Sequence, residues 1–260
     1  MIKLKNCKLK QKLKERKTTF GTWLTTGHTN IAEIMAQSGF EWITIDMEHS
    51  CITLDIAQQL IQIIEAYDVA PLVRVGEKNP NLIKRVMDAG AYGVVVPMVN
   101  SKEDAELAVK AVKYPPKGTR GVGLARAQEY GFDFEEYANA LKNNSIVIAQ
   151  IEHIDGVNNL EKILSVKGID GCIIGPYDLS GSLGIPGKFN DPKVKTALEK
   201  VEKTCKKMNV SLGMHVIPPD YREVKKYADK GYNFLAISLD TLFLGTICRE
   251  QIKKAKKEIK

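Results

Sequence analysis

Short runs of β-branched and apolar residues alternate with longer amphipathic stretches along almost the whole chain. Some runs are apolar at every position, such as Val94-Val95-Val96 and Cys172-Ile173-Ile174, which is typical of a parallel sheet covered on both faces. Most runs begin about 20–30 residues apart, the length of one strand–helix unit. They predict strands at Phe20–Thr25, Trp42–Asp46, Pro71–Val75, Gly93–Pro97, Ile146–Glu152, Gly171–Gly175, Ser211–Val216 and Asn233–Ser238.

The stretches between these runs have helical patterns. They predict helices at Ile31–Ser38, Leu54–Tyr67, Pro80–Ala89, Lys102–Val112, Phe134–Lys142, Gly156–Ser165, Pro192–Met208, Pro219–Lys230 and Leu242–Lys257. Eight strands that alternate with helices, without a break in composition, predict a closed (β/α)8 TIM barrel and a single domain. The alternative is a doubly wound open sheet, but Gly21, Gly27 and Gly39 do not form the glycine-rich dinucleotide loop it would need.

Charge is unevenly distributed. The net charge is +7, residues 1–17 contribute 8 − 1 = +7, residues 249–260 contribute 6 − 2 = +4, and the interior is −4. Nucleic-acid-binding proteins usually spread basic residues over a face of the fold, so we expect no nucleic-acid partner. Residues 1–17 are predicted to form a basic helical extension outside a barrel domain of residues 18–260. Its lysines are expected to be solvated surface, with a tether to an anionic surface as the alternative.

The remaining composition indicates a globular protein of the cytoplasm. Hydrophobic residues make up 44% of the chain and charged residues 27%, which excludes a disordered chain. No run approaches the ~18 apolar residues of a membrane span, and the first lysines precede no apolar signal-peptide core, so we expect no membrane partner. The cysteines are odd in number, scattered and free of C-x-x-C, which favours a reducing compartment.

Polar residues are concentrated where the predicted strands end, which in a barrel of this type is where the chemistry lies. They are Asp46, Glu48, His49, Arg74, Gln150, Glu152, His153, Asp178, His215 and Asp240. A buried arginine is costly unless it binds an anion, so Arg74 is interpreted as an anion clamp. His49 is a base, a ligand or a surface residue on this evidence.

Glu152 and Asp178 follow successive strands, which lie ~4.8 Å apart in a sheet. Their oxygens would suit Mg²⁺ or Mn²⁺, with Co²⁺ as a further candidate; the alternative is that one pairs with Arg74 or caps a helix. None of the 31 lysines falls at a strand end, which disfavours a Schiff-base mechanism. Asp88, on a predicted helix, is either solvated or orients a histidine. His28, His153 and His215 are interpreted as packing or loop residues, and the glycine-rich stretch Lys117–Gly131 as an active-site loop candidate.

Six segments, in order, resemble the HpcH/HpaI aldolase family of metal-dependent pyruvate aldolases. They are Trp42-Ile-Thr-Ile-Asp-Met-Glu-His49, Pro71-Leu-Val-Arg74-Val, Val96-Pro97-Met98-Val99, Tyr114-Pro-Pro-Lys-Gly-Thr-Arg120-Gly-Val-Gly123, Gln150-Ile-Glu152 and Ile174-Gly-Pro-Tyr-Asp178-Leu-Ser180. The resemblance extends from about Gly21 to Gly245. It implies a (β/α)8 barrel, a hexamer with a swapped last helix, and reversible cleavage of a 4-hydroxy-2-keto acid into pyruvate and an aldehyde.

The resemblance also implies roles for particular residues. Glu152 and Asp178 would hold the metal, and Arg74 would steady the enolate oxygen. His49 would be the base or hold the catalytic water, with Asp88 as its partner. Gln150 would lie at the substrate, and the backbone at Gly175 and Tyr177 would receive the pyruvate carboxylate.

Three departures concern the aldehyde side of the site. Met47 and Tyr177 replace smaller residues of the family pattern, and the loop after Gly123 is about two residues short. The same-class alternative is a lyase of the citrate or malyl-CoA type, for which Arg120 and Arg126 could bind nucleotide phosphates. A different class, a catalytically silent scaffold, would have no need of this cluster at its strand ends.

Overall fold

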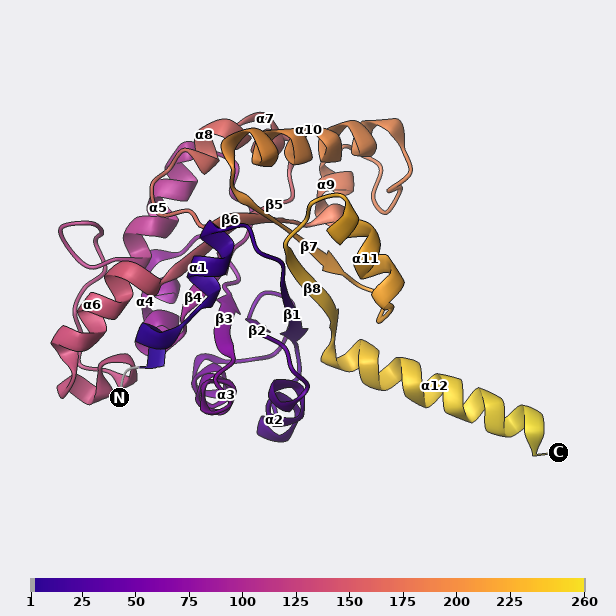
Figure 1. Ribbon diagram of the computed structural model, residues 1–260, viewed down its shortest axis with the longest axis horizontal. Helices are drawn as coiled ribbons and strands as arrows, with labels where there is room; N and C mark the ends of the chain where they lie inside the picture. Colours follow the sequence, from indigo (N-terminus) through magenta and orange to yellow (C-terminus); the bar gives the residue numbers. More distant parts are fainter. Residues whose placement is uncertain (1–2, 260) are drawn as a thin grey trace.

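Eight parallel strands close into a barrel in the computed structural model of the protein, which describes residues 3–259 (Figure 1). The strands pair in chain order, and β8 returns to β1. They are β1 (Thr19–Leu24), β2 (Trp42–Asp46), β3 (Ala70–Arg74), β4 (Gly93–Val96), β5 (Ile146–Ile151), β6 (Gly171–Ile174), β7 (Ser211–Val216) and β8 (Phe234–Leu239). The predicted single-domain TIM barrel is confirmed, and each predicted strand end lies within one residue of the observed one.

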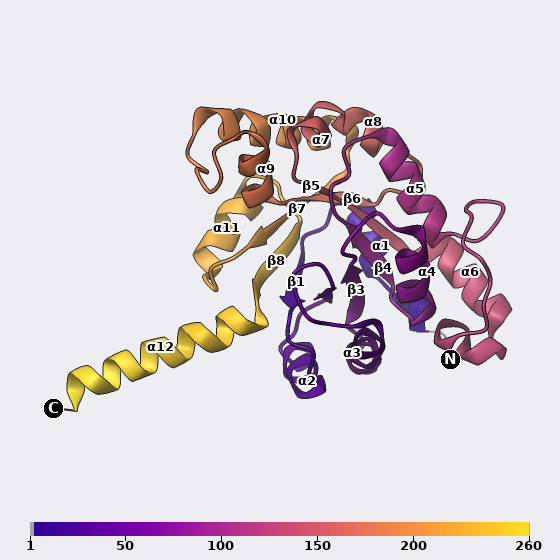
Figure 2. The same ribbon diagram turned by 180° about the vertical axis from the view of Figure 1, so that it is seen from behind.

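Helices alternate with the strands and surround the barrel (Figures 1 and 2). They are α2 (Thr29–Gln37), α3 (Leu54–Ala66), α4 (Pro80–Asp88), α5 (Lys102–Val112), α6 (Phe134–Asn144), α7 (Ile154–Asn158), α8 (Leu160–Leu164), α9 (Pro176–Ser182), α10 (Pro192–Met208), α11 (Tyr221–Asp229) and α12 (Asp240–Glu258). The single helix predicted at Gly156–Ser165 was wrong, because a break at Asn159 divides it into α7 and α8.

Two further elements were not predicted as such. The helix α9 was missed because it has only seven residues, including Gly181 and two serines, although Pro176 at its first position is a start signal. The stretch predicted as an irregular loop, Lys117–Gly131, contains the 3₁₀ segment η2 (Arg126–Gly131).

The basic extension closes the amino end of the barrel. It contains the 3₁₀ turn η1 (Lys3–Asn6) and α1 (Leu9–Lys14), which confirms a short helix before β1; positions 1, 2 and 260 of the predicted domains lie outside the described residues. The Ser211 hydroxyl, at the start of β7, donates to the carbonyl of Leu13 at 2.6 Å. Leu9 and Leu13 are buried against the core.

The lysines of this extension are largely paired with the body. Lys3 pairs with Asp68, Lys5 with Glu136, Lys10 with Asp170 and Lys12 with Glu41. Three of these lysines keep 37–41% of the side chain exposed while they pair, and Lys10 keeps 22%, so the segment is a solvated surface that also carries ion pairs to the body. The acidic body attracts the basic segment, which fastens it across the barrel end.

One close approach illustrates how the sequence fills the barrel. The Trp42 ring stacks on Phe234, with centroids 3.9 Å apart. Gly21 on the neighbouring strand is required there, because a Cβ at this position would lie 2.0 Å from the Trp42 ring. The interior below the mouth is thus packed and leaves the carboxyl ends of the strands to form the site.

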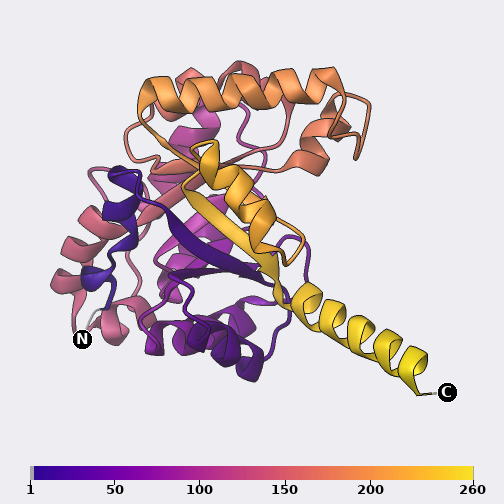
Figure 3. The same ribbon diagram turned by 45° about the vertical axis from the view of Figure 1, so that its right-hand side comes forward.

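The last helix, α12, extends away from the barrel in all three views (Figure 3). It contacts β8 and β1 near its start. Leu244, Ile247 and Ile252 on its surface are each more than half exposed. Within residues 3–259, no helix combines the length and the apolar character needed to cross a membrane.

Candidate active site

A cavity of about 410 Å³ opens at the carboxyl ends of the strands. Of the residues expected at the site, His49, Arg74, Gln150, Gly175, Tyr177 and Asp178 line it. It is also lined by Trp23, Thr25, Asp46, His215 and Leu239, among others. A larger cavity of about 910 Å³ lies under the amino-terminal extension, at the other end of the barrel. Its charged residues Lys3, Lys12, Glu41 and Asp68 pair with one another, so the mouth cavity is the better candidate.

Arg74, at the end of β3, is held in one orientation by two carboxylates. Its Nε donates to Asp46 Oδ1 at 2.9 Å and its NH2 donates to Asp46 Oδ2 at 2.6 Å. Its NH1 lies 3.0 Å from Glu48 Oε2. Burial raises the pKa of the Glu48 carboxyl, against the lowering effect of the Arg74 charge. A planar guanidinium clamped on two edges presents a fixed positive charge to the cavity.

Asp46 also orders the chain after β2. Its Oδ1 accepts the backbone N–H groups of Glu48 at 3.0 Å and His49 at 3.2 Å. The turn carries the His49 imidazole to the cavity wall, where it makes no side-chain hydrogen bond within the described residues. His49 is thus positioned by its backbone and leaves both ring nitrogens for substrate or water.

Glu152 is 3% exposed and lies just after β5. Its Oε1 accepts the backbone N–H of Met98 at 2.7 Å, and its Oε2 accepts the Gln150 amide. Met98 has a left-handed φ of 52°, a costly conformation that aims its N–H at this carboxylate. Burial raises the pKa of the Glu152 carboxyl, and the neighbouring Asp178 carboxylate raises it further.

Asp178 lies in the first turn of α9 and, among residues 3–259, has no hydrogen-bond or ion-pair partner. Gly175 leaves room for the Glu152 carboxylate, since a Cβ there would lie 2.7 Å from Glu152 Oε2. Glu152 and Asp178 are neighbouring carboxylates, one of them buried, and no lysine or arginine among the described residues lies between them as a partner. A divalent cation would neutralise their charge. The described residues hold no group of three or more histidine, cysteine or acidic side chains suited to a metal, so water and substrate oxygens would complete the shell.

Two predicted site residues do not line the cavity: Glu152 is buried beside it, and Asp88 lies elsewhere. It ends α4, and its carboxylate accepts a hydrogen bond from Arg120 NH2 at 2.6 Å. Helices of the barrel run opposite to the strands, so the end of α4 is at the amino end of the barrel. The structure therefore does not bring Asp88 to His49 within the chain, and the proposed pairing remains a prediction.

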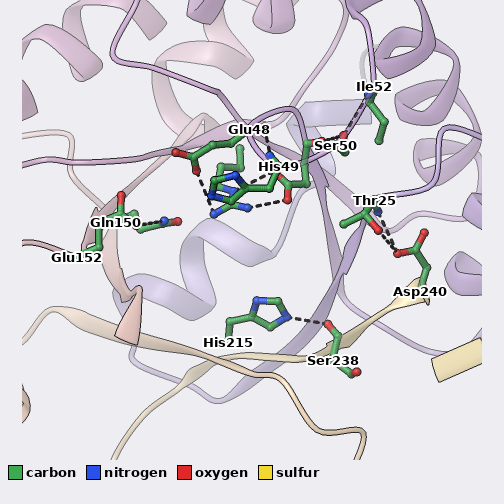
Figure 4. Close-up of polar contacts among 12 residues, drawn as sticks. Thr25, Glu48, His49, Ser50, Ile52, Gln150, Glu152, His215, Ser238 and Asp240 are labelled. Atoms are coloured by element: carbon green, nitrogen blue, oxygen red, sulfur yellow. Dashed lines mark hydrogen bonds and ion pairs between the residues drawn. The ribbon is translucent and has the colours of Figure 1, made fainter. Parts of the chain in front are cut away.

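The other histidines and Asp240 have local structural roles. His28 and His153 accept backbone N–H groups at the starts of α2 and α7, as expected of loop residues. Asp240 accepts the Thr25 hydroxyl at 2.7 Å and the Thr26 N–H at 2.7 Å, which ties the end of β1 to α12 (Figure 4).

The residues of the mouth match a known family. The model of the family described as HpcH/HpaI aldolase/citrate lyase matches residues 19–245. The chain belongs to this family. It is accordingly an enzyme of the carbon–carbon lyase class.

Several known proteins are similar over nearly the whole chain. A 2-keto-3-deoxy-L-rhamnonate aldolase of Escherichia coli O17:K52:H18 is 35% identical over 235 residues, which covers 90% of this chain and 87% of that protein. An HpcH/HpaI aldolase/citrate lyase family protein from Burkholderia cenocepacia J2315 has a TM-score of 0.91 at 31% identity and covers 96% and 99%. The citrate synthase SbnG has a TM-score of 0.85 at 26% identity and covers 96% and 98%.

Two cavity residues were underestimated by strand-end reasoning. Trp23 was not considered because it is apolar, and His215 was interpreted as a packing residue. Trp23 stacks on His215 with centroids 4.9 Å apart, and Arg74 Cζ lies 4.3 Å from the Trp23 ring centroid. The signal available in the sequence was their position near the ends of β1 and β7, where side chains face the mouth.

Tyr177, one of the departures from the family pattern, lines the cavity. Its side chain is 58% exposed at the cavity, and its ring meets Phe189 edge to face at 4.8 Å. An aromatic pair thus stands at one side of the mouth.

Proposed function

We propose that the protein is a divalent-metal-dependent aldolase that reversibly cleaves a 4-hydroxy-2-keto acid into pyruvate and an aldehyde. The observation that carries the proposal is a mouth cavity lined by Asp178 and Arg74, with the buried Glu152 carboxylate close enough for both charges to act on it. The named activity of the Escherichia coli relative is an aldolase reaction on a 2-keto-3-deoxy acid, which supports the same class of substrate here.

Glu152 and Asp178 would hold the cation. Mg²⁺ or Mn²⁺ is expected, with Co²⁺ as a further candidate, because both ligands are hard oxygens and no cysteine lines the cavity among the described residues. When bound, the cation supplies Lewis acidity that stabilises negative charge on the substrate's keto oxygen.

The chain's own residues supply the remaining functions. Arg74, locked by Asp46 and Glu48, presents a fixed positive charge to the same developing oxyanion, so little reorganisation accompanies the reaction. Gln150 orients the Glu152 carboxylate. The Tyr177 N–H, in the first turn of α9, lacks an intrahelical partner. Together with the backbone at Gly175, whose own N–H donates to the Ile151 carbonyl at 3.2 Å, it is proposed to receive the pyruvate carboxylate.

His49 is the proposed base. In cleavage it would take the proton of the C4 hydroxyl, directly or through a water molecule, while the C3–C4 bond breaks and the electron pair moves to the pyruvate half. Its exposed imidazole at the cavity wall is compatible with this role.

A lysine mechanism lacks a suitable residue in the described part of the chain. No lysine lines the cavity, and Lys78, the nearest along the sequence to Arg74, donates to the Met98 carbonyl and to Asp104. Borohydride treatment in the presence of pyruvate should therefore leave no covalent adduct, and an adduct detected by mass spectrometry would overturn the proposal.

The similarity to a citrate synthase favours the alternative of an acyl-CoA lyase. The two arginines that could bind its nucleotide phosphates are, however, paired with other residues. Arg120 is buried and pairs with Asp88, and Arg126 pairs with Glu65. Release of pyruvate from a free 4-hydroxy-2-keto acid, coupled to lactate dehydrogenase, distinguishes the two reactions.

We further propose a homo-oligomer, expected from the family to be a hexamer in which α12 is exchanged between neighbours. The support is the projection of α12 from the barrel with exposed Leu244, Ile247 and Ile252 (Figure 1). Light scattering should give a mass several times that of the chain, and Ile247→Asp should lower it. A cytoplasmic location is proposed from the free cysteines.

A further inference from the structure

His215 has a defined tautomer at the wall of the cavity. Its Nε2 lies 2.9 Å from the carbonyl oxygen of Ser238, which can only accept, so Nε2 carries the proton and donates (Figure 4). Nδ1 of the neutral ring is then an acceptor. Burial, together with the nearby Arg74 charge, lowers the pKa of His215 to about 4, so the ring is neutral under ordinary conditions.

The acceptor nitrogen faces the site. In Figure 4 it lies on the side of the ring toward His49 and Glu48, and it has no hydrogen-bond partner among residues 3–259. The ring itself is fixed by its stack on Trp23, with planes 7° apart. Ser238 is buried with a left-handed φ of 50°, next to an irregularity in the β1–β8 register, and this backbone aims its carbonyl at the ring.

A second polar atom of the same wall is also unpartnered. The indole N–H of Trp23 is buried and lacks an acceptor within the described residues. An unsatisfied buried donor costs free energy unless a ligand or water completes it. The indole nitrogen is covered by neighbouring atoms, so Nδ1 of His215 is the polar atom that the stacked pair presents to the cavity.

The chemistry of the substrate limits what can satisfy the acceptor. The pyruvate half carries a carboxylate and a keto oxygen, which only accept hydrogen bonds. Hydroxyl groups of the aldehyde half are the donors available. The C4 hydroxyl gives its proton to the base in the proposed reaction, so the remaining donor is a hydroxyl further along the aldehyde.

We propose that His215 is a specificity-determining residue that accepts a hydrogen bond from a hydroxyl of the aldehyde portion, so that the enzyme selects hydroxylated aldehydes. The inference rests on the proposed function. Trp23 holds the ring in place through the stack.

The test compares glyceraldehyde with propanal, which lacks the hydroxyls, in the condensation with pyruvate and Mn²⁺. His215→Phe keeps a flat ring for the Trp23 stack but removes the acceptor. The ratio of kcat/KM for glyceraldehyde to that for propanal should fall about tenfold, the size of one hydrogen bond, and the ratio cancels any general loss. His215→Gln, which retains an acceptor, should restore part of the ratio, and His28→Phe serves as a control.

A second readout does not depend on turnover. In EDTA-treated protein, the ¹⁵N resonance of His215 Nδ1 should move upfield on addition of 2-keto-3-deoxygluconate and not on addition of pyruvate. The assignment would be overturned if the His215→Phe variant lost kcat/KM equally for both aldehydes, so that the ratio stayed unchanged. An unmoved Nδ1 resonance would agree with that result. Deuterium exchange of the pyruvate methyl group in the wild-type enzyme tests the proposed function separately, so the two failures are distinguishable.

Discussion

Asp46 holds Arg74 through two parallel hydrogen bonds, from Nε at 2.9 Å and from NH2 at 2.6 Å. Such a two-edged pair fixes the plane of the guanidinium as well as its position. The arginine therefore faces the cavity without having to be ordered by the substrate.

The first prediction concerns this pair. Arg74→Ala should lower kcat by about 10²–10³, as for loss of one oxyanion donor, because no other arginine lines the cavity among the described residues. Asp46→Asn should give a smaller loss, since it weakens the clamp but keeps the charge of Arg74. Lactate dehydrogenase-coupled turnover measures both, with the exposed Arg85→Ala on α4 as control. Wild-type kcat in Arg74→Ala would refute the role.

The second prediction concerns the metal. EDTA should abolish turnover, and Mg²⁺ or Mn²⁺ should restore it. Calorimetric titration with Mn²⁺ alone should show weaker binding to Glu152→Gln by about 10-fold or more, because one of two anionic ligands is lost. Glu161→Gln, an exposed carboxylate paired with Lys207, is the control. Equal Mn²⁺ affinity in the wild type and Glu152→Gln would remove Glu152 from the metal site.

The third prediction concerns Asp88 and Arg120. The Arg120 side chain is fully buried, and it donates to Asp88 and to the Tyr137 hydroxyl. Asp88→Ala leaves this charge without its carboxylate and should lower the free energy of unfolding by about 3–5 kcal/mol. Asp229→Ala, at an exposed pair with Lys225, should cost no more than about 1 kcal/mol.

Urea denaturation measures this difference, and the pH profile of kcat measures the other role proposed for Asp88. A stable Asp88→Ala variant with a displaced pH profile would favour partnership with His49. Lost stability with an unchanged profile would favour the buried ion pair.

The fourth prediction concerns pH and stability. Burial lowers the pKa of Lys113 to about 7, and its ammonium nitrogen lies 2.9 Å from the Leu141 carbonyl. Between about pH 7 and the ordinary value of 10.5, the unfolded chain binds the proton and the folded chain does not. The contribution of Lys113 to stability should therefore rise with pH across this window, by up to about 1.4 kcal/mol per pH unit.

The measurement is the free energy of unfolding in urea at pH 6 and pH 9. The difference between wild type and Lys113→Met should change between the two pH values. The difference between wild type and Lys110→Met, at an exposed position of the same helix, should not. A pH-independent difference for Lys113→Met would show that its pKa is not lowered.

The strands were predictable because residues packed inside the barrel must be apolar. Short apolar runs rich in β-branched residues have few interpretations other than buried strands. The cavity residues at strand ends followed from the same register: the sequence position of Arg74 or Asp178 is enough to place it at the mouth. The position of His215 at the end of β7 was predictable from the sequence, but its contact with Trp23 was not, because the stack joins β1 and β7, which are distant in the chain. Asp88 is a case in which the sequence position misleads. It lies fourteen residues after Arg74, but this spacing does not reveal that α4 returns to the opposite end of the barrel.

The amino-terminal extension has a practical consequence for anyone shortening this chain. Deleting residues 1–17 would take the formal charge from +7 to 0 and would uncover the apolar surface beneath Leu9 and Leu13. A protein without net charge and with newly exposed apolar surface tends to precipitate near pH 7. Shortened chains that begin at β1 should therefore be insoluble when expressed, whereas chains that keep the lysine-rich extension should remain in solution.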